Sequence, residues 1–316
     1  MRANDVLSGY CKLRKKTDWK KGLFIGGFLL IPLIHFAVFT LYVNISALVM
    51  AFQRYDGATN TISWDITYNF AMFFRNLTSS NEMYRKMLLN SVLYFPVVDF
   101  IMLPLSVISA YFLYRKIKLS KVFRFIFFLP NIIPIVVLSI AFRNMWDTSF
   151  GPVNMFLRDV FGVPPGDLPA WLLDPNYAMG MLYFYAVWAG IGYNVILLNG
   201  AMQRIPPEIF ESARMDGIGS WREIWSIVVP LIWGTVSTLF VTGAMVVFTQ
   251  TLHPLVVTPN QGESETWTIG LVILQATEGG QQYYAAAMGV LCVLIGVPLV
   301  QLLRKGIDKI YDTVEV

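Results

Sequence analysis

Six long apolar runs divide this chain, and they constrain its fold more than any other feature. Each run supplies the roughly 20 residues that an α-helix needs to cross a bilayer. Charged residues make up only 14% of the chain, whereas soluble domains carry about 25%. We therefore predict an all-α integral membrane protein with six transmembrane helices, over residues 22–52, 88–114, 122–145, 177–202, 225–250 and 283–303.

Basic residues gather on alternate segments of this pattern. Most of the 24 Lys and Arg residues lie in the N-terminal tail, in the loops near 115–124 and 204–222, and after residue 303, while the loop over 251–282 has none. The positive-inside rule therefore predicts cytoplasmic N and C termini. The chain divides into a basic tail over 1–21, a membrane domain over 22–303 and a second tail over 304–316. The net charge of +4 reflects this bias, so we expect no nucleic-acid partner.

The cysteines and histidines offer no metal site. Cys11 falls in the basic tail and Cys292 in the last apolar run, so the predicted topology separates them. His35 and His253 are the only histidines, and no Cys/His spacing typical of a metal site is present. We interpret both histidines as packed or interfacial residues.

A polar segment over 206–230 separates the fourth and fifth apolar runs and carries strong helix signals. Pro206 and Pro207 suit a helix start, because proline lacks the N–H that would be unpaired there. Glu208 and Glu211 then lie near the positive end of the helix dipole. Gly217 supplies a stop, since glycine enters the left-handed conformation freely. The pattern predicts a short helix that ends in a sharp turn.

A second helix is predicted just after this turn. Ser220, followed three residues later by Glu223, matches a capping box, and Pro230 should bend the chain where the fifth run begins. In the first helix, apolar residues share one face, namely Ile209, Phe210 and Ala213. That helix could lie in the lipid interface or dock into a groove on another protein. Its acidic polar face disfavours anionic lipid and favours the groove.

The spacing of this segment resembles a known motif. Glu211-Ser212-Ala213, Asp216-Gly217, Ile227 and Pro230 are similar to the "EAA" loop of permease subunits of bacterial ABC importers, with Ser212 and Val229 as mild departures. Similarity to the carbohydrate-uptake permeases, and especially to the oligo- and polysaccharide branch, extends over most of the chain. It includes Asn90-Ser91, Phe123-Arg124, Phe128-Leu129-Pro130, Gly151-Pro152-Val153-Asn154, Trp171-Leu172-Leu173-Asp174-Pro175, and Trp188 with Gly190, Gly192, Tyr193 and Asn194.

The resemblance implies the type I ABC importer permease fold in a bacterial cytoplasmic membrane, and it implies a mechanism. A loop helix over 206–220, within a cytoplasmic coupling loop over 205–222, would sit in a cleft of a separate ATPase. Closure of two ATPases on ATP would then drive alternating access. Residues expected to serve this coupling are Glu208, Phe210, Glu211, Ser212, Ala213, Asp216 and Gly217.

Other partners follow from the same resemblance: a second permease, expected to be a different but related chain, and an extracytoplasmic solute-binding protein. The chain has no phosphate-binding Gly-x-x-x-x-Gly-Lys-Ser/Thr loop. We therefore expect no enzyme activity, no catalytic residue and no cofactor in this chain, with ATP and magnesium bound by the partner ATPase.

Polar and aromatic residues inside the predicted spans are candidates for a sugar pathway. They are Asp99, Tyr185, Trp188, Tyr193, Asn194 and Thr242. For any single one of these residues, hydrogen bonding between helices is the favoured explanation. An ion- or proton-coupled secondary transporter is the alternative. It predicts inverted repeats and ion-coupling residues at mid-depth, and apart from Asp99 the sequence has neither. A membrane enzyme would need paired carboxylates, and the acids of the loop over 147–176 lack a catalytic spacing.

Overall fold

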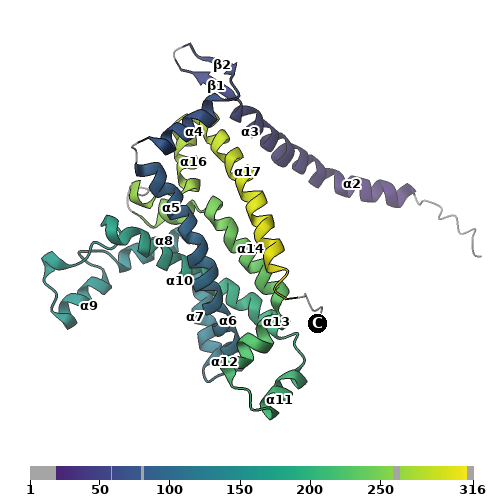
Figure 1. The fold of residues 1–316 in the computed structure, drawn as a ribbon, viewed down its shortest axis with the longest axis vertical. Coiled ribbons are helices and arrows are strands. Elements are labelled where there is room, and N and C mark those ends of the chain that lie inside the picture. The colour runs from purple at the N-terminus through teal and green to yellow at the C-terminus, as the bar shows by residue number, and fades with distance from the viewer. Residues whose placement is uncertain (1–18, 58, 80–81, 259–263, 312–316) are drawn as a thin grey trace, which may run out of the picture.

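The computed structural model describes residues 19–57, 59–79, 82–258 and 264–311. Most of the predicted tail over 1–21, including Cys11, and the last residues of the tail over 304–316 lie outside this range. Helices dominate the described chain, and one small hairpin is its only sheet (Figure 1).

The first predicted span is a helix of 33 residues that leaves the bundle (Figure 1). It consists of α2 (Trp19–His35), a π-helical segment η1 (Phe36–Tyr42) and α3 (Val43–Ala51). Its most apolar 18-residue window is 0% buried. This span therefore presents its apolar side chains to surroundings outside the chain.

Three further spans are long helices within the bundle, close to their predicted positions. They are the 33-residue helix formed by α5 (Glu82–Pro96), η2 (Val97–Met102) and α6 (Leu103–Tyr114), then α10 (Pro175–Met202) and α17 (Gln282–Ile307). The η2 segment is π-helical and interrupts its span near the middle. Local π-helical turns of this kind occur often at functional sites.

The remaining two predicted spans are sharply bent. Helix α7 (Ser120–Ile132) meets α8 (Ile135–Met145) at 108°, because Pro134 holds Ile133 in an extended conformation with a ψ of 133°. The second pair meets at 84°. It joins α12 (Ser220–Glu223), η4 (Ile224–Val228) and α13 (Val229–Leu231) to α14 (Trp233–Thr249). Among the described residues, four helices are thus long enough to span a bilayer, or up to six if each bent pair counts as one span.

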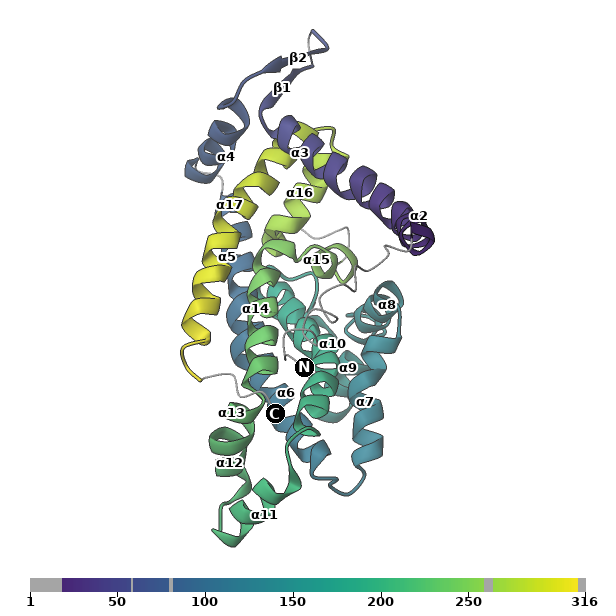
Figure 2. The same ribbon diagram turned by 90° about the vertical axis from the view of Figure 1, so that its right-hand side faces the viewer.

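Short elements lie between the spans. They are the antiparallel strands β1 (Gln53–Asp56) and β2 (Thr61–Trp64), then α4 (Tyr68–Thr78), α9 (Pro152–Phe161), η3 (Pro165–Asp167), α11 (Pro207–Met215), α15 (Leu252–Val256), η6 (Ser264–Thr266) and α16 (Ile269–Glu278). The hairpin and α11 lie at opposite ends of the molecule in both views (Figures 1 and 2). This separation agrees with the predicted sidedness, although the direction of the termini stays a prediction.

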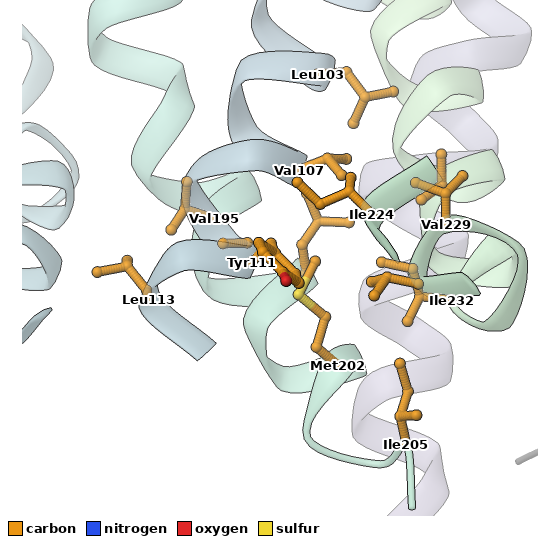
Figure 3. Packing of buried hydrophobic residues seen from close by; sticks show 14 of the residues in the cluster. Leu103, Val107, Tyr111, Leu113, Val195, Met202, Ile205, Ile224, Val229 and Ile232 are labelled. Carbon is orange, nitrogen blue, oxygen red and sulfur yellow. The ribbon is translucent and has the colours of Figure 1, made fainter. Parts of the chain in front are cut away.

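The hydrophobic core at the α11 end joins three spans. Side chains of α6 and α10 pack there against the η4–α13 bend, with Tyr111 and Val107 of α6 facing Ile224 (Figure 3). Helices α7 and α10 approach closely at Gly192, where a Cβ would overlap the backbone carbonyl of Phe127. Glycine at this point lets two helices pack without a side chain between them.

Candidate functional site

Helix α11 is defined at both ends by the residues that the sequence indicated. Pro206 is its N-cap and Glu208 lies in its first turn. Gly217 has a φ of 71°, and its N–H donates to the carbonyl of Arg214 at 3.0 Å. The N–H of Ile218 donates to the carbonyl of Ala213 at 3.0 Å. These two bonds form a Schellman motif, so the predicted glycine stop is confirmed.

The apolar face of α11 is occupied by the chain itself. Phe210 is 4% exposed and Ala213 is 3% exposed, and the Phe210 ring lies 5.2 Å from that of Tyr114 at the end of α6. Burying a phenylalanine side chain is worth about 1.5–3 kcal/mol. This contact fastens α11 to the second span and removes the need for lipid on that face.

The opposite face of α11 is free. Glu208, Glu211, Ser212 and Asp216 are all exposed. Within the part of the chain that the structure describes, none of these three carboxylates forms an ion pair. The seven residues predicted for coupling thus divide into an outward acidic face, two inward anchors in Phe210 and Ala213, and the turn at Gly217.

The predicted capping box is wrong, although the second helix does begin at Ser220. Glu223 turns inward instead of back to the helix start, and its side chain is 1% exposed. The Tyr111 hydroxyl donates to Glu223 Oε1 at 3.0 Å, and Arg115 Nη1 lies 3.6 Å from the same oxygen. An unpaired buried carboxylate would be destabilising by several kcal/mol, so these partners are what make its burial tolerable.

Tyr111, Arg115 and Glu223 were missed as a group by sequence reasoning. Arg115 entered only as a positive charge that set the topology, and Glu223 only as a cap. More than a hundred residues separate Glu223 from its partners along the chain, so no local pattern reveals the contact. The available signal was an acidic residue, Glu223, that lies within four residues of the apolar run that begins the fifth span.

The bend that follows matches the prediction from Pro230, displaced by two residues. The backbone leaves helical geometry at Ile232, with φ −103° and ψ 17°. At this bend, the Trp233 indole N–H donates to the carbonyl of Ile307 at 3.3 Å. The end of the last span is therefore fixed to the start of α14.

The residues predicted for a sugar pathway do not form one site in this structure. Tyr185 is fully buried, and its hydroxyl shares a 3.0 Å hydrogen bond with Ser139. The Trp188 ring lies against that of Phe142, with ring centroids 5.8 Å apart and an interplanar angle of 31°. Both belong to an aromatic cluster between α8, α10 and α15. The structure thus gives both residues a packing role, one of the two roles that the sequence allowed for them.

The other four candidates lie in contrasting environments. Tyr193 is 57% exposed and Asn194 is 7% exposed, while the exposed hydroxyl of Thr242 donates to the carbonyl of Thr238 at 2.8 Å. Among the described residues, no hydrogen bond joins any two of the six. Tyr193 and Thr242 are thus the candidates whose side chains remain accessible.

Asp99 is the most unusual member of this set. It lies in the π-helical η2 segment, is 3% exposed, and neither carboxyl oxygen has a hydrogen-bond partner within the described residues. Its carboxyl lies directly against Gly243 of α14, where a Cβ would overlap it and approach its Cγ to 2.8 Å. Isolated buried carboxylates are strongly unfavourable when ionised. A buried polar group therefore lies where the second and fifth spans meet.

Comparison with known proteins places this architecture. The family model described as "Binding-protein-dependent transport system inner membrane component" matches residues 102–310. The diacetylchitobiose uptake system permease protein NgcF of Streptomyces coelicolor is 28% identical over 300 residues, which cover 91% of this chain and 82% of the relative. The maltose/maltodextrin permease protein MalF of Escherichia coli K12 is 33% identical over 38% of this chain, but the match spans only 22% of MalF.

A solved structure agrees in fold. The crystal structure of a bacterial alginate ABC transporter, in complex with an alginate pentasaccharide-bound periplasmic protein, contains a chain that superposes with a TM-score of 0.80. The match covers 95% of this chain and 99% of that one at 21% identity. The superposition shows a shared fold, and at this low sequence identity it shows the fold alone.

Proposed function

The chain belongs to the family of inner membrane components of binding-protein-dependent transport systems, and on that premise we propose that it carries an oligosaccharide across the bacterial inner membrane under the power of a separate ATPase. Its class, a permease subunit of a carbohydrate ABC importer, follows from the family and its relatives. The coupling to ATP, the alternating access and the size of the sugar are the proposal.

The observation that carries the proposal is the form of α11. Its acidic face is exposed, its apolar face is locked to α6, and a left-handed glycine sets its direction. A surface helix with an unpaired polar face and a fixed base is suited to a groove on another protein. We propose that this groove belongs to the ATPase, which binds ATP and magnesium, and that Glu211 makes the main polar contact.

The sugars named for similar proteins support an oligosaccharide. They are diacetylchitobiose, maltose or maltodextrin, and alginate. Exposed Tyr193 and Thr242 offer an aromatic face and a hydroxyl of the kind that binds sugars. We propose that these two side chains line the pathway, with Asn194 nearby in sequence, and that Asp99 moves relative to α14 as the spans rock.

The remaining partners are a second permease and a solute-binding protein. The unburied apolar helix of α2 and α3 supports a second membrane subunit, since one face of it could pack against that subunit and the rest against lipid. The family description names a binding protein, and the alginate complex contains a periplasmic one. We propose that the binding protein docks at the hairpin end, opposite α11.

Cross-linking tests the coupling surface directly. A photo-crosslinking reagent attached to a cysteine at Ser212, on the exposed face of α11, should couple to the ATPase on illumination, and ATP should change the yield. Lys118→Cys is the matched control, because Lys118 is also exposed but belongs to the loop between α6 and α7. Efficient cross-linking from Lys118 and none from Ser212 would show that the ATPase binds elsewhere.

A further inference from the structure

Both halves of the segment around Gly217 are fastened to the same turn of α6. Before the glycine, Phe210 packs on Tyr114. After it, Glu223 accepts a hydrogen bond from Tyr111 and pairs with Arg115. These α6 residues lie within five positions of each other, at the last turn of the second span.

The second of these attachments is chemically unusual. The neighbours of Glu223 along the chain include the fully buried Ile224 and Val228, which belong to the hydrophobic core at this end of the bundle, so the acid lies at the edge of that core. Replacing a buried ion pair with well-packed apolar residues is often neutral or even stabilising. Stability alone therefore does not explain a carboxylate here. A charged contact does fix one geometry, because the carboxylate must meet both the hydroxyl and the guanidinium.

The receiving helix connects this end to the middle of the bundle. Helix α6 continues through η2 into α5 as one span of 33 residues, and η2 carries Asp99 against Gly243 of α14. Arg115 is 22% exposed, so it reaches water while its partner Glu223 is enclosed. A displacement of α12 at Glu223 would thus act on the end of the second span, a continuous helix whose middle contacts α14.

We propose that Glu223, Tyr111 and Arg115 form a joint that transmits movement of α11 to the second span. The inference rests on the proposed function, since α11 moves only if an ATPase holds it. Glu223 is a positioning residue in this scheme and contacts no substrate. Without the joint, only the Phe210–Tyr114 contact links this segment to α6, so less of the movement of α11 reaches the second span and ATP is hydrolysed with less sugar moved.

Three single substitutions separate the elements of the joint. Glu223→Gln keeps an acceptor for the Tyr111 hydroxyl but removes the attraction to Arg115. Tyr111→Phe removes only the hydrogen bond, and Arg115→Gln removes the charge from a side chain that already reaches water. Arg124→Gln is the matched control, because Arg124 is a basic residue of the adjacent segment whose contact, at 3.4 Å, is with Asn199.

The measurement is the number of sugar molecules imported per ATP hydrolysed. The full transporter, with its second permease, ATPase and binding protein, is reconstituted in liposomes with radiolabelled diacetylchitobiose, maltose and alginate pentasaccharide as probes. We expect each joint variant to keep hydrolysing ATP while the ratio falls about threefold or more, within the range for residues on a coupling route. Arg124→Gln should keep the wild-type ratio. If Glu223→Gln does not assemble, the other two variants decide.

Two outcomes would overturn the inference in distinguishable ways. A wild-type transporter that imports none of the probes on ATP would overturn the proposed function and this joint with it. A working transporter in which the joint variants keep the wild-type ratio, or lose it no more than Arg124→Gln does, would overturn the joint alone.

Discussion

Gly217→Ala is the substitution that tests the role of α11 most sharply, because its cost has a single source. Gly217 has a φ of 71°, and a Cβ added there meets nothing within 4 Å. An alanine would therefore cause no steric clash. Its only cost would be the free energy of the left-handed backbone conformation, about 1–2 kcal/mol. A penalty of this size lowers the equilibrium constant for the native turn by a factor of about 5–30.

The native turn at Gly217 is the conformation that presents α11 to the ATPase. In the alternative conformations the N–H groups of residues 217 and 218 lose their carbonyl partners, Arg214 and Ala213, and α11 no longer points in its native direction. The apparent affinity of a partner falls by the fraction of molecules that are competent. We therefore expect the ATPase concentration that gives half-maximal uptake to rise, by a factor of at most about 30.

Gly219 supplies the matched control within the same loop. It also faces open space, but its φ is −71°, a value that alanine adopts without strain. Gly219 is also the N-cap of α12, where alanine is less favourable than glycine, so Gly219→Ala should shift the same titration much less than Gly217→Ala does. Gly217→Asn should fall between the two, because asparagine tolerates the left-handed region better than alanine does. Gly217→Pro should abolish uptake without affecting membrane insertion. Proline cannot adopt the positive φ of residue 217, and it lacks the N–H that donates to the carbonyl of Arg214.

The assay is uptake into proteoliposomes at increasing ATPase concentration, with the amount of inserted permease measured for every variant. Normal half-saturation in Gly217→Ala would refute the reasoning. So would a defect in Gly219→Ala as large as that in Gly217→Ala, because the left-handed backbone would then not be its cause.

Three further substitutions test other parts of the account. Glu211→Lys reverses a charge on the exposed face of α11, so uptake should be lost while the membrane content of permease, measured by immunoblot, stays normal; normal uptake would remove Glu211 from the contact. Gly243→Ala adds a methyl against Asp99 and should destabilise the bundle by about 1–3 kcal/mol through overpacking, seen as a lower midpoint in thermal unfolding. Asp99→Ala should relieve that loss in the double variant, and strictly additive effects would show that the two residues are not in contact. Asn90→Ala removes an amide that donates to the carbonyls of Glu265 and Trp267, in the loop over 251–282, at 2.8 and 3.0 Å, and should lower the same midpoint by an amount equivalent to about 1–3 kcal/mol; an unchanged midpoint would mean that the loop is held by other contacts.

The features of α11 that could be predicted from sequence are local ones. Proline at the start, acids in the first turn and glycine at the stop act within one turn of helix, so their effect is the same in any surroundings. The apolar face of Phe210 and Ala213 could also be predicted as a face. Its partner, Tyr114, could not, because hydrophobic spacing shows which side chains seek burial and leaves open what buries them.

Glu223 shows the limit of such local reasoning. The Ser220–Glu223 spacing is that of a capping box, and the helix does begin at Ser220. The side chain nevertheless turns to Tyr111 and Arg115, because an ion pair and a hydrogen bond in a buried site outweigh one exposed cap. Only the packing of α6 against the bend brings those partners within reach.

The spans show the same division between local and tertiary causes. Apolar length was sufficient to count up to six spans, but it carries no direction, so the 108° break at Pro134 was not anticipated. In the proposed pathway, residue type placed Tyr185 and Trp188 beside Tyr193. The structure packs the first two into an aromatic cluster and leaves Tyr193 exposed, a distinction set by the neighbouring helix α8.

Sugar uptake into vesicles, with and without the ATPase subunit, tests the central claim most directly. The account predicts uptake only when the ATPase and ATP are both present, and no change when an ionophore collapses ion gradients. Uptake that persists on an ion gradient without the ATPase would contradict it and would favour the ion-coupled alternative.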